Sequence, residues 1–110
     1  MSKSAEELFE DVINFFASDS KVSQAKMFGS PGLKIRGKIF AFLTKGQLIL
    51  KLPKERVDGL VAAKTGDHFG HVFAPDDWRP MKEWVALKPT SEKEWLTLAQ
   101  EAKDFVISLH

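Results

Sequence analysis

The sequence predicts an α+β fold, with an antiparallel five-stranded sheet and helices packed on one face, in the order α-β-β-β-α-β-β-α. Two observations support this prediction. Apolar residues recur at helical spacing near both ends and once in the middle, and short apolar runs separated by turn residues lie between these segments. The chain has 110 residues, 44% of them hydrophobic, and no Cys. We therefore expect a single domain over residues 1–110 that needs no disulfide or metal to fold.

The first helix is predicted from about Ala5 to Ala17. Ser4 and Glu7 have the spacing of a capping box, in which each residue bonds the backbone N–H of the other. The apolar positions that follow are Leu8, Phe9, Val12, Ile13, Phe15 and Phe16. Because this apolar stripe is wide, we expect the helix to be covered on more than one side.

Three strands are predicted next, as an antiparallel meander. The runs 33–36, 39–43 and 48–52 are separated by turn signals at Gly37-Lys38 and Lys45-Gly46-Gln47. Residues 39–43 are apolar on both faces of the strand. This pattern indicates a central strand or one that a partner covers.

A short helix and two more strands follow. Pro53 fits the first turn of the helix, and Gly66 is a plausible residue to end it. Residues 69–73 are predicted as one strand and 81–88 as the next. In the latter strand, alternation places Lys82, Trp84, Ala86 and Lys88 on one face and Glu83, Val85 and Leu87 on the other.

The last helix has the clearest pattern in the chain. Residues 91–94 (Ser-Glu-Lys-Glu) form a second capping-box pattern. Apolar side chains then recur at helical spacing almost to the C-terminus, at Trp95, Leu98, Ala99, Ala102, Phe105, Val106 and Leu109.

The charges are unevenly distributed along the chain, although the formal net charge is only +1. Residues 1–20 carry −4, residues 21–64 carry +8 and residues 65–110 carry −3. Two interpretations remain open. The acidic terminal helices neutralise the basic sheet, within one chain or in a dimer, or the basic segment is a surface that binds polyanions.

Basic and aromatic side chains on the strands define the candidate binding surface. Lys34 and Arg36 would share one strand face, as would Lys82 and Trp84. Such a face could stack bases and neutralise phosphates, or it could bind another protein. The complete candidate set is Lys34, Arg36, Lys51, Arg79, Lys82 and Trp84.

Catalytic and metal-binding patterns are weak. His68 and His71, with Asp76 and Asp77 nearby, suggest a metal site, but residues 68 and 71 lie on opposite strand faces unless the chain bends at Gly70. The sequence has no Gly-x-Ser-x-Gly motif and no Cys nucleophile. We expect no cofactor, no metal and no enzymatic activity. A small enzyme or ligand-binding protein that uses residues 68–84 is the less favoured alternative.

Four blocks in order resemble the TfoX N-terminal-domain-like family, which is related to YjbR-like proteins. They are residues 26–33 (KMFGSPGL), 37–43 (GKIFAFL), 46–52 (GQLILKL) and 79–85 (RPMKEWV). The resemblance implies an α+β fold like that of type III secretion chaperones. The family pattern supplies no catalytic residues. The protein for which the family is named is a bacterial regulator of competence genes. Turn geometry and packing explain the motif residues Met27, Phe28, Gly29, Gly32, Leu33, Gly37, Pro80 and Met81.

We therefore expect a non-enzymatic protein-interaction or regulatory module. The N-terminal residues have no signal-peptide pattern, and no apolar run is long enough to span a membrane, so a cytoplasmic protein is expected. The expected partner is another protein, with a homodimer as a further possibility. The alternative function is nucleic-acid binding through the basic and aromatic sheet face.

Overall fold

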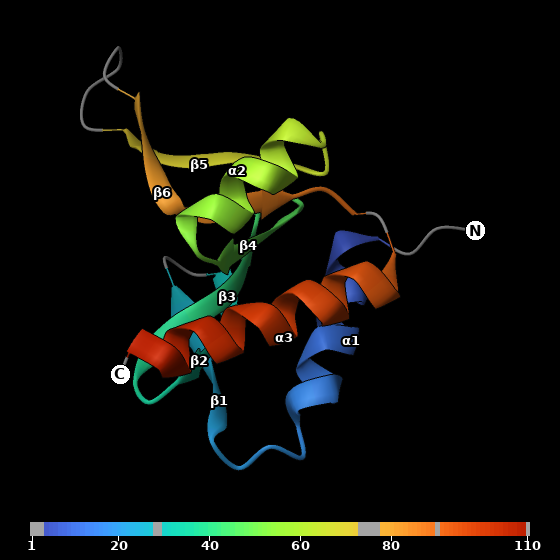
Figure 1. Ribbon diagram of the computed structural model, residues 1–110. Coiled ribbons are helices and arrows are strands. Elements are labelled where there is room, and N and C mark those ends of the chain that lie inside the picture. Colours follow the sequence, from blue (N-terminus) through green and yellow to red (C-terminus); the bar gives the residue numbers. More distant parts are fainter. Residues whose placement is uncertain (1–3, 28–29, 73–77, 90, 110) are drawn as a thin grey trace.

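The computed structural model describes residues 4–27, 30–72, 78–89 and 91–109, in which three helices cover one face of a six-stranded antiparallel sheet (Figure 1). The helices are α1 (Ala5–Phe16), α2 (Lys54–Ala62) and α3 (Glu92–Leu109). The strands are β1 (Val22–Met27), β2 (Ser30–Ile35), β3 (Lys38–Thr44), β4 (Gln47–Lys51), β5 (Gly66–Val72) and β6 (Trp78–Leu87). The α+β class and the antiparallel sheet are confirmed, but the predicted number of five strands is wrong. No helix in the described ranges is long and apolar enough to cross a membrane.

Strand β1 is the strand that the sequence did not predict. The sheet order is β1-β2-β3-β4-β6-β5, so β1 lies at one edge and pairs with β2. Its residues Ser23, Gln24 and Lys26 are exposed. An exposed edge strand needs no alternation of apolar side chains, so the hydrophobic pattern does not indicate it. The predicted meander of three strands is therefore a meander of four.

Two tight turns connect the central strands. Arg36 (φ 53°) and Gly37 (φ 77°) join β2 to β3, and Lys45 (φ 52°) and Gly46 (φ 73°) join β3 to β4. Two consecutive left-handed residues form a type I′ turn, whose twist matches that of the paired strands. Arg36 therefore lies in a turn. The prediction that it shares a strand face with Lys34 is wrong.

One continuous core lies between the helices and the sheet. All three helices contribute side chains to it, together with the helix-facing side of β2, β3, β4 and β6. Trp95, Phe9 and Phe40 are among its largest fully buried side chains. Phe40 and the adjacent Ala41 both belong to this core, because the pairing of β2 and β3 shifts by one residue at Leu33 and leaves Phe40 without a register partner.

Helix α1 confirms the predicted capping box. The Ser4 hydroxyl accepts a hydrogen bond from the Glu7 N–H, and the Glu7 carboxylate accepts one from the Ser4 N–H, both at 3.2 Å. The side chains buried on the sheet side are Ala5, Leu8, Phe9, Val12 and Phe16. Phe15, which belongs to the predicted stripe, is 50% exposed, so this side of the helix is only partly covered.

Helix α2 differs from its prediction at both ends. Pro53 is the N-cap and not a residue of the first turn, and the helix ends at Ala62 with Ala63 as C-cap. Gly66 is the first residue of β5 and does not cap the helix. Strand β5 begins at Gly66, before the predicted start at residue 69, and residue 73 lies outside the described residues. Strand β6 begins at Trp78, before the predicted start at residue 81.

Helix α3 begins where its capping pattern predicts. The Ser91 hydroxyl accepts a hydrogen bond from the Glu94 N–H at 3.1 Å. The buried side chains are Trp95, Leu98, Ala99, Ala102 and Val106, all members of the predicted stripe. Leu109, at the end of that stripe, is 45% exposed.

An ion pair joins α3 to the turn that follows α1. Lys103 Nζ lies 2.9 Å from Asp19 Oδ2 and 5.6 Å from the centre of the Phe16 ring. The hydrogen bond from Lys103 lowers the pKa of Asp19, and a second hydrogen bond, from the Lys21 N–H, lowers it further.

The lowered pKa of Asp19 predicts a contribution to acid stability. The ionised carboxylate stabilises the folded protein at pH values above the pKa of an unfolded aspartate, and this contribution is lost as the pH falls through the lowered pKa of the folded state. We expect the melting temperature of wild type to fall more between about pH 5 and pH 2.5 than that of Asp19→Asn. Asp58→Asn is the control, because Asp58 forms an exposed pair with Lys54. Equal acid slopes for wild type and Asp19→Asn would contradict the prediction.

Candidate functional site

A second apolar cluster lies on the sheet face away from the helices. Phe42 of β3, Ile49 of β4 and Ala86 of β6 are buried and are consecutive register partners across three strands. The partly buried side chains packed against them are Ile39, Phe69 and Trp84. No helical residue belongs to this cluster. The apolar run 39–43 is therefore apolar on both faces because each face packs against a different cluster of the same chain.

Aromatic contacts hold the centre of this cluster. The Phe42 ring contacts the Phe69 ring at 5.7 Å and 80°, and the Trp84 ring at 5.7 Å and 60°, both edge-to-face. Lys51 is the register partner of Trp84, and its Nζ lies 5.6 Å from the Trp84 ring centre. Edge-to-face and cation–π contacts each stabilise a folded protein by about 0.5–1.5 kcal/mol. The two contacts together hold the Trp84 ring in one orientation.

The three predicted lysines lie beside this apolar centre. Lys34 lies between the core residues of β2 and pairs with Ile39, and Lys51 pairs with Trp84. Alternation along β6 places the exposed Lys82 on the face of Trp84. We call the surface formed by Lys34, Ile39, Phe42, Ile49, Lys51, Phe69, Lys82, Trp84 and Ala86 the open sheet face. Within the described part of the chain, no acidic side chain forms an ion pair with its three lysines.

Not every predicted site residue is placed on this surface. Arg36 lies in the turn between β2 and β3. The backbone of Arg79 pairs with that of His71, and the Arg79 side chain lies outside the described part of the structure. Sequence reasoning missed Phe42, Ile49 and Phe69 as members of the site, although the two-sided apolar run was the signal for Phe42.

Acidic side chains neutralise basic ones at positions away from the open sheet face. Arg56 of α2 donates to both carboxylate oxygens of Glu101 on α3, at 3.1 and 3.2 Å. This pair joins the basic middle of the chain to an acidic helix, as one of the two interpretations predicts. It does not reach the open sheet face, because both helices lie on the opposite side of the sheet.

The metal hypothesis gains no support from the described residues. Among them, no group of three His, Asp or Glu side chains is placed to hold a metal ion. His68 is exposed. The register of β5 and β6 shifts between His68 and Gly70, which is where a metal site would need the strand to bend. The His71 side chain and residues 76 and 77 lie outside the described part of the structure.

The motif residues that the structure describes have structural roles. A Cβ atom on Gly32 would lie 3.1 Å from both the Ala41 carbonyl oxygen and Phe42 Cβ, so glycine lets β2 approach β3 closely. Leu33 is buried in the main core, and Gly37 supplies the left-handed turn. The remaining motif residues, or their side chains, lie outside the described part: Met27, Phe28, Gly29, Pro80 and Met81.

Comparison with known proteins agrees with these structural features. No curated protein matches the chain. The family model of the TfoX N-terminal domain matches residues 14–104, which include all six strands, α2 and most of α3. A match over this share of the sequence shows the family. The chain belongs to the TfoX N-terminal domain family.

Proposed function

We propose that this domain is a non-enzymatic interaction module with a regulatory role, and that its open sheet face binds an acidic segment of another protein. One observation supports this proposal above the others. An apolar centre with two partly exposed aromatic rings has three lysines beside it, on a sheet face that none of the described helices covers. A bacterial, cytoplasmic setting and a homodimer remain predictions.

The chemistry of this surface favours a partner with both acidic and apolar side chains. Trp84 and Phe69 are partly buried and held by Phe42, so a partner would contact rings that need little further ordering. Lys34, Lys51 and Lys82 would pair with carboxylates around these rings. Such charges mainly increase the rate of association and the specificity.

Nucleic-acid binding is the second candidate, and the Lys51–Trp84 pair is the observation that favours it. A lysine beside an indole could contact a phosphate while the ring stacks on a base. The other rings favour a protein partner. Phe42 is buried, so its ring offers no free face to a base, and Phe69 is partly buried against it. Three lysines would also neutralise fewer phosphates than a typical nucleic-acid site.

The test compares two triple variants as bait in a native lysate, with and without nuclease. The first variant reverses the three lysines of the open sheet face (Lys34→Glu, Lys51→Glu, Lys82→Glu). The control makes the same change in net charge at exposed turn lysines (Lys21→Glu, Lys45→Glu, Lys64→Glu). Wild type and the control are expected to recover one stoichiometric protein after nuclease treatment, and the first variant is expected to lose it at least about tenfold.

Other results would change the conclusion. Recovery that disappears with nuclease would replace the protein partner by nucleic acid. Equal recovery by both triple variants would exclude the open sheet face as the binding site. Thermal unfolding of both variants shows whether either one has failed to fold.

The predicted homodimer has its own test. Both faces of β3 are packed within one chain, so this strand does not require a second copy to cover it. The mass from multi-angle light scattering distinguishes a monomer from a dimer.

A further inference from the structure

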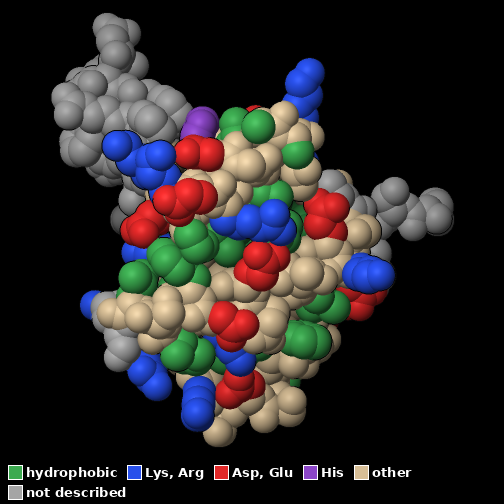
Figure 2. Space-filling view, viewed as in Figure 1, with side chains coloured by type: hydrophobic (Ala, Val, Ile, Leu, Met, Phe, Trp, Pro, Cys, Tyr) green, Lys and Arg blue, Asp and Glu red, His purple; other side chains and the backbone are tan. Residues whose placement is uncertain are grey.

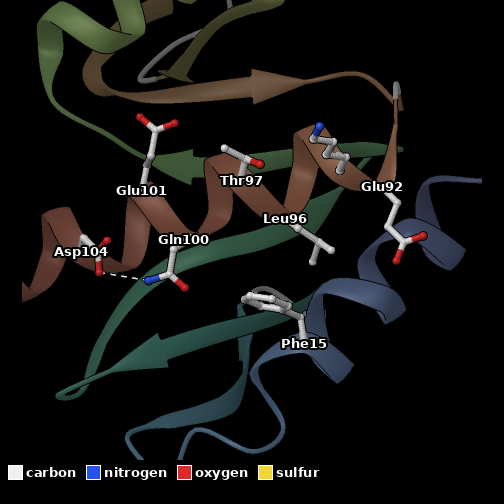
Figure 3. A pocket seen from close by; sticks show the side chains of 8 residues that line it. Phe15, Glu92, Leu96, Thr97, Gln100, Glu101 and Asp104 are labelled. Atoms are coloured by element: carbon white, nitrogen blue, oxygen red, sulfur yellow. Dashed lines mark hydrogen bonds between the residues drawn. The ribbon is translucent and has the colours of Figure 1, made fainter.

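A groove on the opposite side of the molecule lies between the end of α1 and the outer face of α3 (Figure 3). It is open to solvent and has a volume of about 770 Å³. Phe15 and Leu96 supply its apolar centre and lie across from each other in the close-up view. Phe15 is the most exposed of the large apolar side chains in the described residues, and its ring is held edge-to-face by Phe16 at 5.0 Å. The groove therefore has an aromatic ring that is held by its neighbour and remains half exposed.

Four of the side chains that line the groove lie on one stripe of α3. Glu92, Leu96, Gln100 and Asp104 all line it, at intervals of four residues. This stripe extends about 18 Å along the helix and has a carboxylate near each end and a leucine between them. Gln100 Nε2 donates to Asp104 Oδ1 at 3.1 Å and fixes that carboxylate at the edge of the groove.

The helices that border the groove are strongly acidic. Helix α1 has four acidic residues and no basic one, and α3 has four acidic and two basic residues, which gives −6 for the two helices together. Of the two basic residues, Lys103 is paired with Asp19 outside the groove and Lys93 lines the groove, where Glu101 is paired with Arg56 of α2. Figure 2, which views this side of the molecule, shows acidic side chains among apolar ones over α3. The acidic surroundings of this groove therefore favour a ligand with positive charge as well as an apolar side chain.

A second copy of this chain does not meet these needs through the same stripe. Antiparallel symmetric pairing of two α3 helices places residue 92 of one copy opposite residue 104 of the other, and parallel symmetric pairing places each of these residues opposite its own counterpart. Either arrangement places the carboxylates of Glu92 and Asp104 against carboxylates of the other copy. Like charges directly opposed across an interface disfavour association.

We propose that this groove binds a basic amphipathic helix of another protein, at a site separate from the open sheet face. The apolar residues of the partner helix pack on Phe15 and Leu96, in the usual manner of a helix in a groove. Its Lys or Arg side chains, spaced about three turns apart, reach the carboxylates of Glu92 and Asp104. The domain then has two interaction surfaces of opposite charge on opposite sides of one sheet, and it can bridge an acidic and a basic partner.

A peptide titration followed by nitrogen-15 NMR tests this proposal directly. The probe is a synthetic helical peptide with two central leucines and lysines at both ends, spaced to match residues 92 and 104. The control peptide has the same leucines with glutamates in place of the lysines. The basic peptide is expected to shift the amide signals of α3 and the end of α1, and the acidic peptide is expected to leave them unchanged.

Protein variants then assign the contacts. Asp104→Asn keeps an oxygen that can accept from Gln100 but removes the charge, and Phe15→Ala removes the exposed ring. We expect the peptide Kd to rise about threefold in the first variant and about tenfold in the second. Glu55→Lys, an exposed change on α2 outside the groove, and the triple variant of the open sheet face are expected to bind the peptide within about twofold of wild type.

Three results would overturn the proposal. The first is the absence of shifts at millimolar peptide, and the second is a Kd that Phe15→Ala and Asp104→Asn leave unchanged. The third is a set of shifts that appears on dilution without peptide, which would show that a second copy occupies the groove. The triple variant of the open sheet face leaves the residues of the groove unchanged. Loss of binding at the open sheet face and loss of peptide binding at the groove are therefore measured independently.

Discussion

Replacing Trp95 by alanine is expected to lower the free energy of unfolding by about 3–5 kcal/mol. Trp95 is 0% exposed and is among the largest fully buried side chains in the main core. It lies in the first turn of α3, a helix that packs against β3 and β4 as well as α1. The substitution would leave a cavity between a helix and a sheet, and the backbones of paired strands cannot move far to fill it.

A hydrogen bond adds to the contribution of Trp95. Its indole Nε1 donates to the Lys88 carbonyl oxygen at 3.1 Å and thereby joins the start of α3 to the end of β6. Trp95→Phe keeps most of the ring volume but leaves that partly buried carbonyl without its donor. We expect a loss of about 1–3 kcal/mol for this variant, which is smaller than the loss for alanine.

Urea unfolding followed by circular dichroism measures both changes, because substituting one of three tryptophans alters the fluorescence itself. Leu109→Ala is the matched control, since Leu109 lies on the same helix and is 45% exposed. It is expected to change stability by less than about 0.5 kcal/mol. A loss of less than about 1 kcal/mol for Trp95→Ala would show that the core rearranges around the shorter side chain.

The elements that sequence reasoning located most accurately are those with local signals. The start of α3 follows from Ser91 and its stripe from Trp95 onward, because the cap and the apolar face are both set by residues a few positions apart. Strand β1 lacks such a signal. Its side chains Ser23, Gln24 and Lys26 are exposed, and only its backbone pairing with β2 makes it a strand.

The open sheet face was predictable in its parts but not in its arrangement. Alternation alone places Lys82 and Trp84 on one face of β6. The Lys51–Trp84 contact requires β4 to lie beside β6, and the Phe42–Phe69 contact brings together side chains from strands that do not pair with each other. The hydrophobic pattern does not specify which distant strands are neighbours, so the apolar centre of the site was missed.

The exposure of Phe15 was not predictable for a related reason. Helical spacing shows that Phe15 belongs to the apolar side of α1, but its burial depends on where α3 crosses that helix. The crossing leaves Phe15 at the edge of the groove while Phe16 packs against Phe40 in the core. Local sequence alone does not determine such a crossing.

Gly66, which the sequence analysis assigned to the end of a helix, is the site of the second large effect on stability. A Cβ atom at this residue would lie 2.7 Å from Val85 Cγ2, 2.9 Å from Leu87 Cδ2 and 3.1 Å from the Ala86 carbonyl oxygen. Val85 and Leu87 are buried in the main core, so their side chains have little room to move. We expect Gly66→Ala to lower the free energy of unfolding by about 1–3 kcal/mol.

The same substitution at Gly59 is expected to have the opposite sign. Gly59 lies inside α2, and a Cβ atom there would meet nothing within 4 Å. Alanine favours a helix interior over glycine by about 0.5–1 kcal/mol, so Gly59→Ala is expected to stabilise the protein by that amount. Urea unfolding of both variants isolates the cause, because the chemical change is identical and only the surroundings differ. If Gly66→Ala were neutral, β5 would have to move away from β6 at no cost, and close packing would not explain glycine at this position.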